Sequence, residues 1–150
     1  MKSDGINKLK YKGERMKLFN WLFCRIRYEI TYFEMEYHLK KVLNGKSNVY
    51  LKNVICHRNI GKTSALARLS VKYNIPVAVS TNFQKKLYEK YIPKYIPKYF
   101  KYKYPEVYVV DETLRGKNCK IFLVEEGIKE EYFNKILKHT CDCMVGYKNY

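Results

Sequence analysis

A glycine-lysine-threonine sequence, Gly61-Lys62-Thr63, is the first group of residues in this chain whose types and order suggest chemistry. An apolar run from Val49 to Ile55 precedes it, and a helical pattern follows it. Strand, tight turn and helix in this order form a phosphate-binding loop, in which turn amides face phosphate oxygens, the lysine reaches the β- and γ-phosphates and the hydroxyl ligates Mg²⁺. Lys62 and Thr63 match those two roles. The full pattern requires another glycine where this chain has Cys56, so the match is partial.

Two strand candidates end in a pair of acidic residues, which is the second requirement of such a site. One carboxylate beside the loop holds Mg²⁺, often through water, and another activates the attacking water. Asp111 and Glu112 follow the apolar residues YVV, and Glu125 and Glu126 follow IFLV. The residues alone leave both pairs open as the acidic partner of the loop.

Apolar runs alternate with helical spacing along most of the chain. Strand patterns lie at residues 49–55, 75–80, 106–111, 120–124 and 143–147, and helical patterns at 63–73, 82–91 and 128–139. We expect Asn74 to end the first of these helices, and Thr81 or Asn82 to cap the second. The alternation predicts an α/β fold with a mostly parallel sheet, flanked by helices and joined by right-handed crossovers.

The N-terminal third of the chain divides into two parts. Residues 1–13 are polar and basic and predict a flexible arm, while residues 14–45 predict an N-terminal helical segment, one helix or two, that stops at Asn44-Gly45. Apolar residues recur in this segment at spacings of three to five positions: Leu18, Leu22, Ile26, Ile30, Phe33, Tyr37 and Val42. We expect this stripe to pack against the sheet rather than to bind a partner. Residues 14–150 then form a single domain.

The chain has 150 residues, with 30 Lys and Arg against 14 Asp and Glu, a net charge of +16. Such an excess favours a polyanionic partner, nucleic acid first, and a lysine-rich coding bias is the alternative. Residues 90–105 are rich in Tyr, Lys and Pro, and the prolines predict no regular helix there. Alternating Lys and Tyr suits single-stranded nucleic acid, with an irregular connection over the edge of the core as the alternative.

Five cysteines in irregular positions, with no secretory signal ahead of them, predict reduced thiols in a cytoplasmic protein. The apolar residues 18–23 are too few to cross a membrane. His139, Cys141 and Cys143 lack the spacing of structural zinc sites, so metal binding there is a minor alternative. Covalent catalysis by Cys56 and His57 is another minor alternative, because adjacent side chains rarely face each other.

Two segments together resemble the ATPase domain of phage terminase large subunits and related viral P-loop ATPases: RNIGKT at 58–63 and LRGKNCKIFLVEEG at 114–127. In that family the loop often reads R-Q-x-G-K-[ST], and the acidic strand follows a Leu-Arg-Gly turn and ends in Asp-Glu. The resemblance implies ATP and Mg²⁺ as cofactors, with Thr63 and Glu125 at the metal and Lys62 and Glu126 as catalytic residues. The implied loop comprises Arg58, Asn59, Ile60, Gly61, Lys62, Thr63 and Ser64.

The function hypothesis is a small Mg²⁺-dependent ATPase of viral or mobile-element type, which acts on or near nucleic acid in the cytoplasm, of the host if viral. A homo-oligomer and a host protein are further candidate partners. The first alternative is a non-enzymatic basic viral factor that binds nucleic acid or a host nucleoprotein; Cys56 in place of Gly and Glu125 in place of Asp hint at a decayed nucleotide site. The second is a nucleoside or nucleotide kinase, for which the chain has few arginines beyond residue 70.

Overall fold

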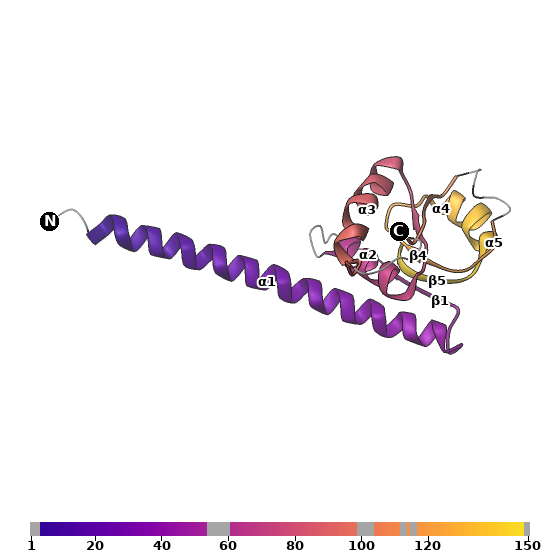
Figure 1. Ribbon diagram of the computed structural model, residues 1–150, viewed down its shortest axis with the longest axis horizontal. Coiled ribbons are helices and arrows are strands. Elements are labelled where there is room, and N and C mark those ends of the chain that lie inside the picture. Colours follow the sequence, from indigo (N-terminus) through magenta and orange to yellow (C-terminus); the bar gives the residue numbers. More distant parts are fainter. Residues whose placement is uncertain (1–3, 54–60, 99–103, 112–113, 115–116, 149–150) are drawn as a thin grey trace.

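Parallel strands form the centre of the protein (Figure 1). The computed structural model describes residues 4–53, 61–98, 104–111, 114 and 117–148, and for residues 4–13 and 136 only the backbone. The strands are β1 (Val49–Asn53), β2 (Val77–Val79), β3 (Val107–Val109), β4 (Cys119–Val124) and β5 (Cys141–Lys148), in the spatial order β1-β5-β4-β2-β3. Each neighbouring pair is parallel, so the sheet is wholly parallel where the sequence predicted a mostly parallel one.

Helices cover both faces of the sheet. One face carries α1 (Asp4–Leu43), α2 (Lys62–Tyr73) and α3 (Asn82–Tyr95), and the other carries α4 (Glu130–Tyr132), the π-helix η2 (Phe133–Leu137) and α5 (Lys138–Thr140) (Figure 1). In β2, Val77 and Val79 join the core beneath α1, α2 and α3, whereas Ala78 joins the core on the opposite face with Leu137. Strands covered on both sides read as continuous apolar runs. The predicted α/β fold is confirmed.

The C-terminal end of α2 and the start of α3 lie where local signals placed them. Asn74 ends α2 in the left-handed conformation, with φ 51°, and its N–H bonds the carbonyls of Ser70 and Val71. Thr81 caps α3, since its side chain accepts a hydrogen bond from the N–H of Gln84 at 3.2 Å. Both predicted caps are confirmed, because capping depends on residues within one helical turn.

α3 runs through Pro93 to Tyr95, so the prediction that the prolines exclude a helix from residue 90 onward is wrong for the first proline. Pro93 lies in the last turn, where its missing N–H removes one hydrogen bond. Ile92 is 3% exposed and packs in the core, which keeps this turn on the sheet. Ile96 leaves the helical conformation directly before the second proline. Residues 99–103 of the Tyr/Lys/Pro-rich connection lie outside the described residues.

α1 is one continuous helix of 40 residues that extends well past the sheet (Figure 1). It begins at Asp4, so most of the predicted arm, residues 1–13, has a helical backbone, and the flexibility of this arm stays a prediction. It ends at Leu43, directly before the predicted stop, and Gly45 adopts a φ of +71° that closes the helix.

The predicted stripe of α1 faces solvent rather than the sheet. Six of its residues are between 47% and 65% exposed: Leu18, Leu22, Ile26, Ile30, Phe33 and Tyr37. The side chains that reach the core are those of Tyr32, Met35, Leu39 and Val42, of which only the last belongs to the stripe. The prediction of core packing is therefore wrong. α1 has apolar residues on two faces, and periodicity alone does not select the face that meets the sheet.

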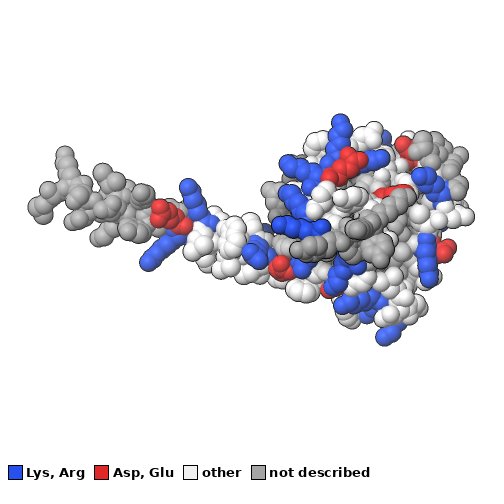
Figure 2. Space-filling view, viewed as in Figure 1, with Lys and Arg blue, Asp and Glu red and all other residues white. Residues whose placement is uncertain are grey.

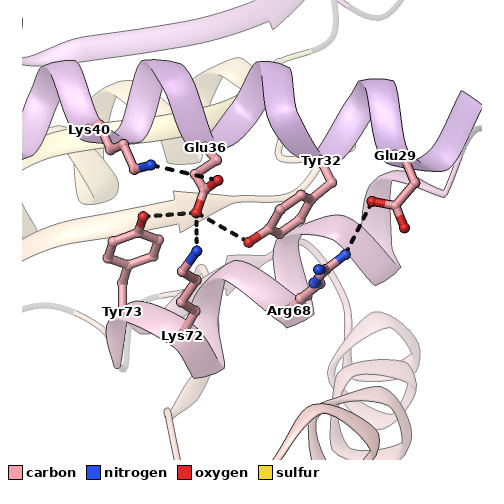
Figure 3. A network of polar contacts seen from close by, with 7 residues as sticks. All are labelled: Glu29, Tyr32, Glu36, Lys40, Arg68, Lys72 and Tyr73. Atoms are coloured by element: carbon pink, nitrogen blue, oxygen red, sulfur yellow. Dashed lines mark hydrogen bonds and ion pairs between the residues drawn. The ribbon is translucent and has the colours of Figure 1, made fainter.

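A network of polar side chains joins α1 to α2 (Figure 3). The buried carboxylate of Glu36 accepts hydrogen bonds from Tyr32 at 3.2 Å, Lys72 at 2.6 Å and Tyr73 at 2.9 Å. Burial works to raise the pKa of Glu36, but the hydrogen bonds from Lys72 and Tyr73 outweigh it and hold this pKa below its ordinary value. Arg68 adds an ion pair to α1. These contacts fix α1 along the C-terminal half of α2.

Candidate functional site

Gly61 starts α2 in a conformation that favours glycine. Its φ is 77°, and a Cβ placed on it would lie 2.7 Å from Cδ2 of Tyr28 on α1. Its carbonyl accepts the N–H of Ala65 at 2.8 Å, which starts the helix. Gly61, Lys62, Thr63 and Ser64 therefore lie at the N-terminal end of α2, where backbone N–H groups and the helix dipole attract anions. The other predicted loop residues, Arg58, Asn59 and Ile60, lie outside the described residues.

Lys62 and Glu126 form an ion pair in the structure. Their Nζ and Oε2 atoms are 2.7 Å apart, and the Lys62 side chain is only 7% exposed against 34% for Glu126. The Lys62 ammonium also lies 5.7 Å from the ring centre of Tyr147 on β5. β5 lies between β1 and β4, and parallel strands all end at the same edge of the sheet. The sheet therefore brings the end of β4 to the start of α2.

Glu125 is buried beside the same helix end, at 2% exposure. Its carboxyl group accepts hydrogen bonds from the hydroxyl of Tyr88, from the side chain of Thr63 and from the N–H of Glu126, the last at 3.1 Å. Burial raises the pKa of Glu125, and these hydrogen bonds only partly offset it. The predicted pair Thr63 and Glu125 is thus in direct contact, as two oxygen groups that could share one cation.

The ends of β2 and β4 are tied together by Gln84. Its Oε1 accepts hydrogen bonds from the N–H and the hydroxyl of Ser80, at 2.8 and 2.7 Å, and its Nε2 donates to the carbonyl of Glu126 at 2.9 Å. The chain leaves β2 toward β3 and leaves β4 toward β5, so its direction reverses between these two strands. Ligands of open α/β sheets bind at such a point, beyond the carboxyl ends of the strands.

Four residues around this site were not predicted from the sequence: Ser80, Gln84, Tyr88 and Tyr147. Only Gln84 had a local signal in the sequence: it lies three positions after Thr81, which is the spacing of a capping box. Burial raises the pKa of Tyr88, with a further contribution from the Glu125 carboxyl, so Tyr88 stays a hydrogen-bond donor. No local pattern marks Tyr88 or Tyr147 as neighbours of the acidic pair, because it is the arrangement of the elements around the sheet that brings these residues together.

Asp111, the described member of the other acidic pair, lies elsewhere in the fold. Asp111 follows β3, the edge strand that is separated from β1 by three other strands, and Glu112 lies outside the described residues. Asp111 lines a cavity of about 710 Å³ between α3 and the β3 edge. Neither Lys62 nor Glu126 lines this cavity, so we treat it as separate from the site described above. Glu126, rather than Asp111, contacts the predicted phosphate-binding lysine.

A smaller cavity of about 430 Å³ lies directly beside Gly61. Its walls come from α1, which contributes Trp21, Arg25 and Tyr28, and from Gly61 and Ser64 at the start of α2. The helix that covers the domain therefore also forms one wall of the space next to the predicted loop. A group bound at the start of α2 would lie near the single tryptophan of the chain.

The minor alternatives gain no support from the described parts of the chain. Within those parts, no group of three or more His, Cys, Asp or Glu side chains is arranged to hold a metal ion. Cys141 is buried and Cys143 partly buried on β5, while His139 belongs to α5. Cys56 and His57 lie outside the described residues. Nor does any described helix combine the length and apolarity needed to cross a membrane.

Searches with this chain against protein-family models, curated proteins and solved structures found no match. The fold is therefore defined here by its own strand order and crossovers, as an all-parallel five-stranded α/β sheet with a long N-terminal helix. The likeness to terminase ATPase domains rests on the two sequence motifs quoted above.

Proposed function

We propose that this protein binds ATP with Mg²⁺ at the start of α2 and hydrolyses it, as a small P-loop ATPase that works on or near nucleic acid. The contact between Lys62 and Glu126, at 2.7 Å, carries the proposal. The sequence offered a phosphate-type lysine and a distant acidic pair as separate hypotheses, and chance would not be expected to bring them within hydrogen-bonding distance.

Each residue has a role that follows from its position. Backbone N–H groups of Gly61 to Ser64 face outward from the helix end and would bind phosphate oxygens. Lys62 is held nearly buried beside them, so its charge acts in a poorly solvated place, where it attracts phosphate more strongly than a surface lysine does. Phosphates that reach Lys62 replace Glu126 as its counter-ion. The released carboxylate is then free to orient and deprotonate a water molecule.

The donor set around Glu125 fits Mg²⁺. Mg²⁺ binds oxygen ligands, and the Thr63 hydroxyl and the Glu125 carboxyl already touch each other. Mg²⁺ would neutralise charge on the phosphates when bound. Burial raises the pKa of Glu125, and a bound cation would favour the charged form of this carboxyl.

A nucleic-acid partner is supported by charge. The net charge of +16 is distributed widely, and Figure 2 shows lysine and arginine side chains over much of the visible face of the globular part and along α1. Lys90, Lys94 and Lys98 are exposed around the end of α3, and the ammonium of Lys94 lies 4.8 Å from the ring centre of Tyr91. Cations and aromatic rings placed together suit single strands.

The test is ATP hydrolysis by the full chain, with and without Mg²⁺, together with ATP binding by calorimetry. Lys62→Ala should weaken ATP binding at least about tenfold and reduce turnover at least about 100-fold, because it removes the buried cation at the phosphates. Lys135→Ala is the matched control: Lys135 also pairs with a glutamate, Glu131 at 2.9 Å, but is exposed and far along the chain. Equal binding and turnover in wild type and Lys62→Ala would reject the proposal.

A second candidate is a basic binding protein with a decayed nucleotide site. The burial of Glu125 favours it, because burial disfavours the charged form of the carboxyl that would bind Mg²⁺. This candidate predicts no ATP binding at millimolar concentration, together with DNA or RNA binding that weakens steeply as salt rises. The kinase alternative stays a prediction, and phosphoryl transfer to an added nucleoside would favour it.

A further inference from the structure

α1 exposes a row of large apolar side chains on the side that faces away from the domain. Seven of them are between 48% and 69% exposed: Met16, Phe19, Phe23, Ile26, Ile30, Phe33 and Tyr37. We call these seven residues the α1 seam. Single exposed apolar residues are common on proteins, but a continuous row of this length marks an interaction surface.

The spacing of the α1 seam is that of a coiled coil. Successive members are separated alternately by three and four positions, from Met16 to Tyr37, which equals the a and d positions of three heptads. A regular spacing of 3.5 residues keeps a narrow apolar line on one side of a supercoiled helix, where it meets the equivalent line of another helix. The core-facing residues, such as Met35 and Leu39, lie on the opposite side, so the domain does not cover the seam.

The described side chains in the free N-terminal half of α1 are not buried by the rest of the protein. From Glu14 to Arg27 every described side chain is exposed, and Figure 1 shows this half of the helix running away from the sheet and the other helices. Helices without tertiary packing are marginal in water, because most of their stability comes from burying an apolar face. The continuous helix therefore needs a partner surface along its free half.

We propose that the α1 seam binds the α1 seam of a second copy of this chain, so that two copies form a helical pair with their domains on the outside. Seven side chains exposed to this extent offer roughly 700 Å² on each copy, which falls within the size of a specific, stable interface once both copies are counted. The proposal does not depend on nucleotide binding.

The charges beside the seam favour a second copy over an anionic membrane. Both signs flank it: Arg15 and Arg27 on the one hand, Glu29 and Glu34 on the other. Glu29 and Glu34 also pair with Arg68 and Lys52 of the same copy. Coiled coils use flanking charges of both signs between helices, whereas helices that lie on anionic lipid have a polar face rich in Lys and Arg. Aromatic residues are common in the seam, and the spacing of its apolar residues repeats along its length. The seams of two copies therefore offer each other matching apolar surfaces.

The test is the molecular mass of the full chain in solution, measured by sedimentation equilibrium at micromolar concentrations. Wild type should have twice the 18.1 kDa mass of the single chain. Ile30→Glu should weaken the dimer at least about 100-fold, because it places a carboxylate at the centre of the seam. Leu18→Glu is the matched control: Leu18 is 65% exposed against 61% for Ile30, but it lies off the seam, so this variant should remain a dimer.

Circular dichroism shows whether each variant is folded, and Ile26→Lys, a second seam change, replaces Ile30→Glu if that variant unfolds. Monomeric wild type, or equal loss of the dimer in the Ile30 and Leu18 variants, would overturn the proposal. Flotation of wild type with vesicles of phosphatidylcholine and phosphatidylserine, lost in Ile30→Glu while the mass stays that of a monomer, would instead assign the seam to a membrane surface.

Discussion

Replacement of Glu126 by glutamine should separate ATP binding from hydrolysis, if the proposed function holds. In the structure Glu126 is the counter-ion of Lys62, at 2.7 Å, and so competes with phosphate for the same ammonium. Glu126→Gln keeps the size and a hydrogen-bond acceptor but removes the negative charge. We therefore expect ATP to bind more tightly to the variant, while turnover is lost.

The size of both effects follows from the contact. A hydrogen bond between charged groups contributes about 1 kcal/mol more than one with a neutral acceptor. Glu126 is 34% exposed, so solvent screens part of this difference, and the expected gain in affinity is about 3- to 10-fold. Loss of a general base costs turnover roughly 100- to 10,000-fold.

The assay pairs calorimetric ATP titration, in Mg²⁺, with measurement of phosphate release. Glu131→Gln is the matched control, because Glu131 also pairs with a lysine, at 2.9 Å, but on an exposed helix. That control should change neither quantity. Weaker ATP binding in Glu126→Gln would refute the competition, and turnover within a few fold of wild type would refute Glu126 as the base.

Three further outcomes are expected. Glu36→Gln should lower the free energy of unfolding by about 1–3 kcal/mol at pH 7. Because the pKa of Glu36 lies below its ordinary 4.5, this stabilisation is present above pH 4.5 and is lost as the pH falls through the folded-state pKa, so urea unfolding of the two proteins should converge below that pKa. Gly146→Ala should lower the melting temperature by roughly 6–12 °C, because the new Cβ would lie 2.0 Å from the carbonyl oxygen of Val124. A fall in melting temperature of less than about 2 °C, measured by calorimetry, would contradict this close approach. Titration with ATP and Mg²⁺ should change the fluorescence of Trp21, which lines the cavity beside Gly61. In Lys62→Ala the same change should require at least about tenfold more ATP. Unaltered emission of wild type at saturating ATP would argue against a ligand in that cavity.

Much of the secondary structure could be predicted because its causes are local. The cap of α3 at Thr81 and the stop of α2 at Asn74 depend on neighbours within one turn. The alternation of apolar strands with helical spacing was enough to predict a layered α/β sheet. Pro93 shows the limit of this reasoning, since the burial of Ile92 against the sheet keeps the last turn of α3 helical in spite of the proline.

The residues of the candidate site could be predicted only in part. Residue types and spacing indicated Lys62 and Thr63 and left two acidic pairs open, Asp111 with Glu112 and Glu125 with Glu126. The fold pairs Glu126, which follows β4, with Lys62, while Asp111 follows the edge strand β3. Tyr88, which reaches Glu125 from 37 positions away, carries no sequence signal for that contact.

The sequence by itself determined the alternation of strands and helices, the caps at Asn74 and Thr81, the candidate residues for phosphate and metal, and the large positive charge. Only the tertiary structure decided which acidic pair stands beside Lys62 and which face of α1 meets the sheet. The physical reason is that α1 has two apolar faces of similar character. The periodicity of the sequence shows how apolar residues are spaced, but not which face packs against the sheet. The face left in solvent, the α1 seam, became visible once Tyr32, Met35 and Leu39 were seen to occupy the core.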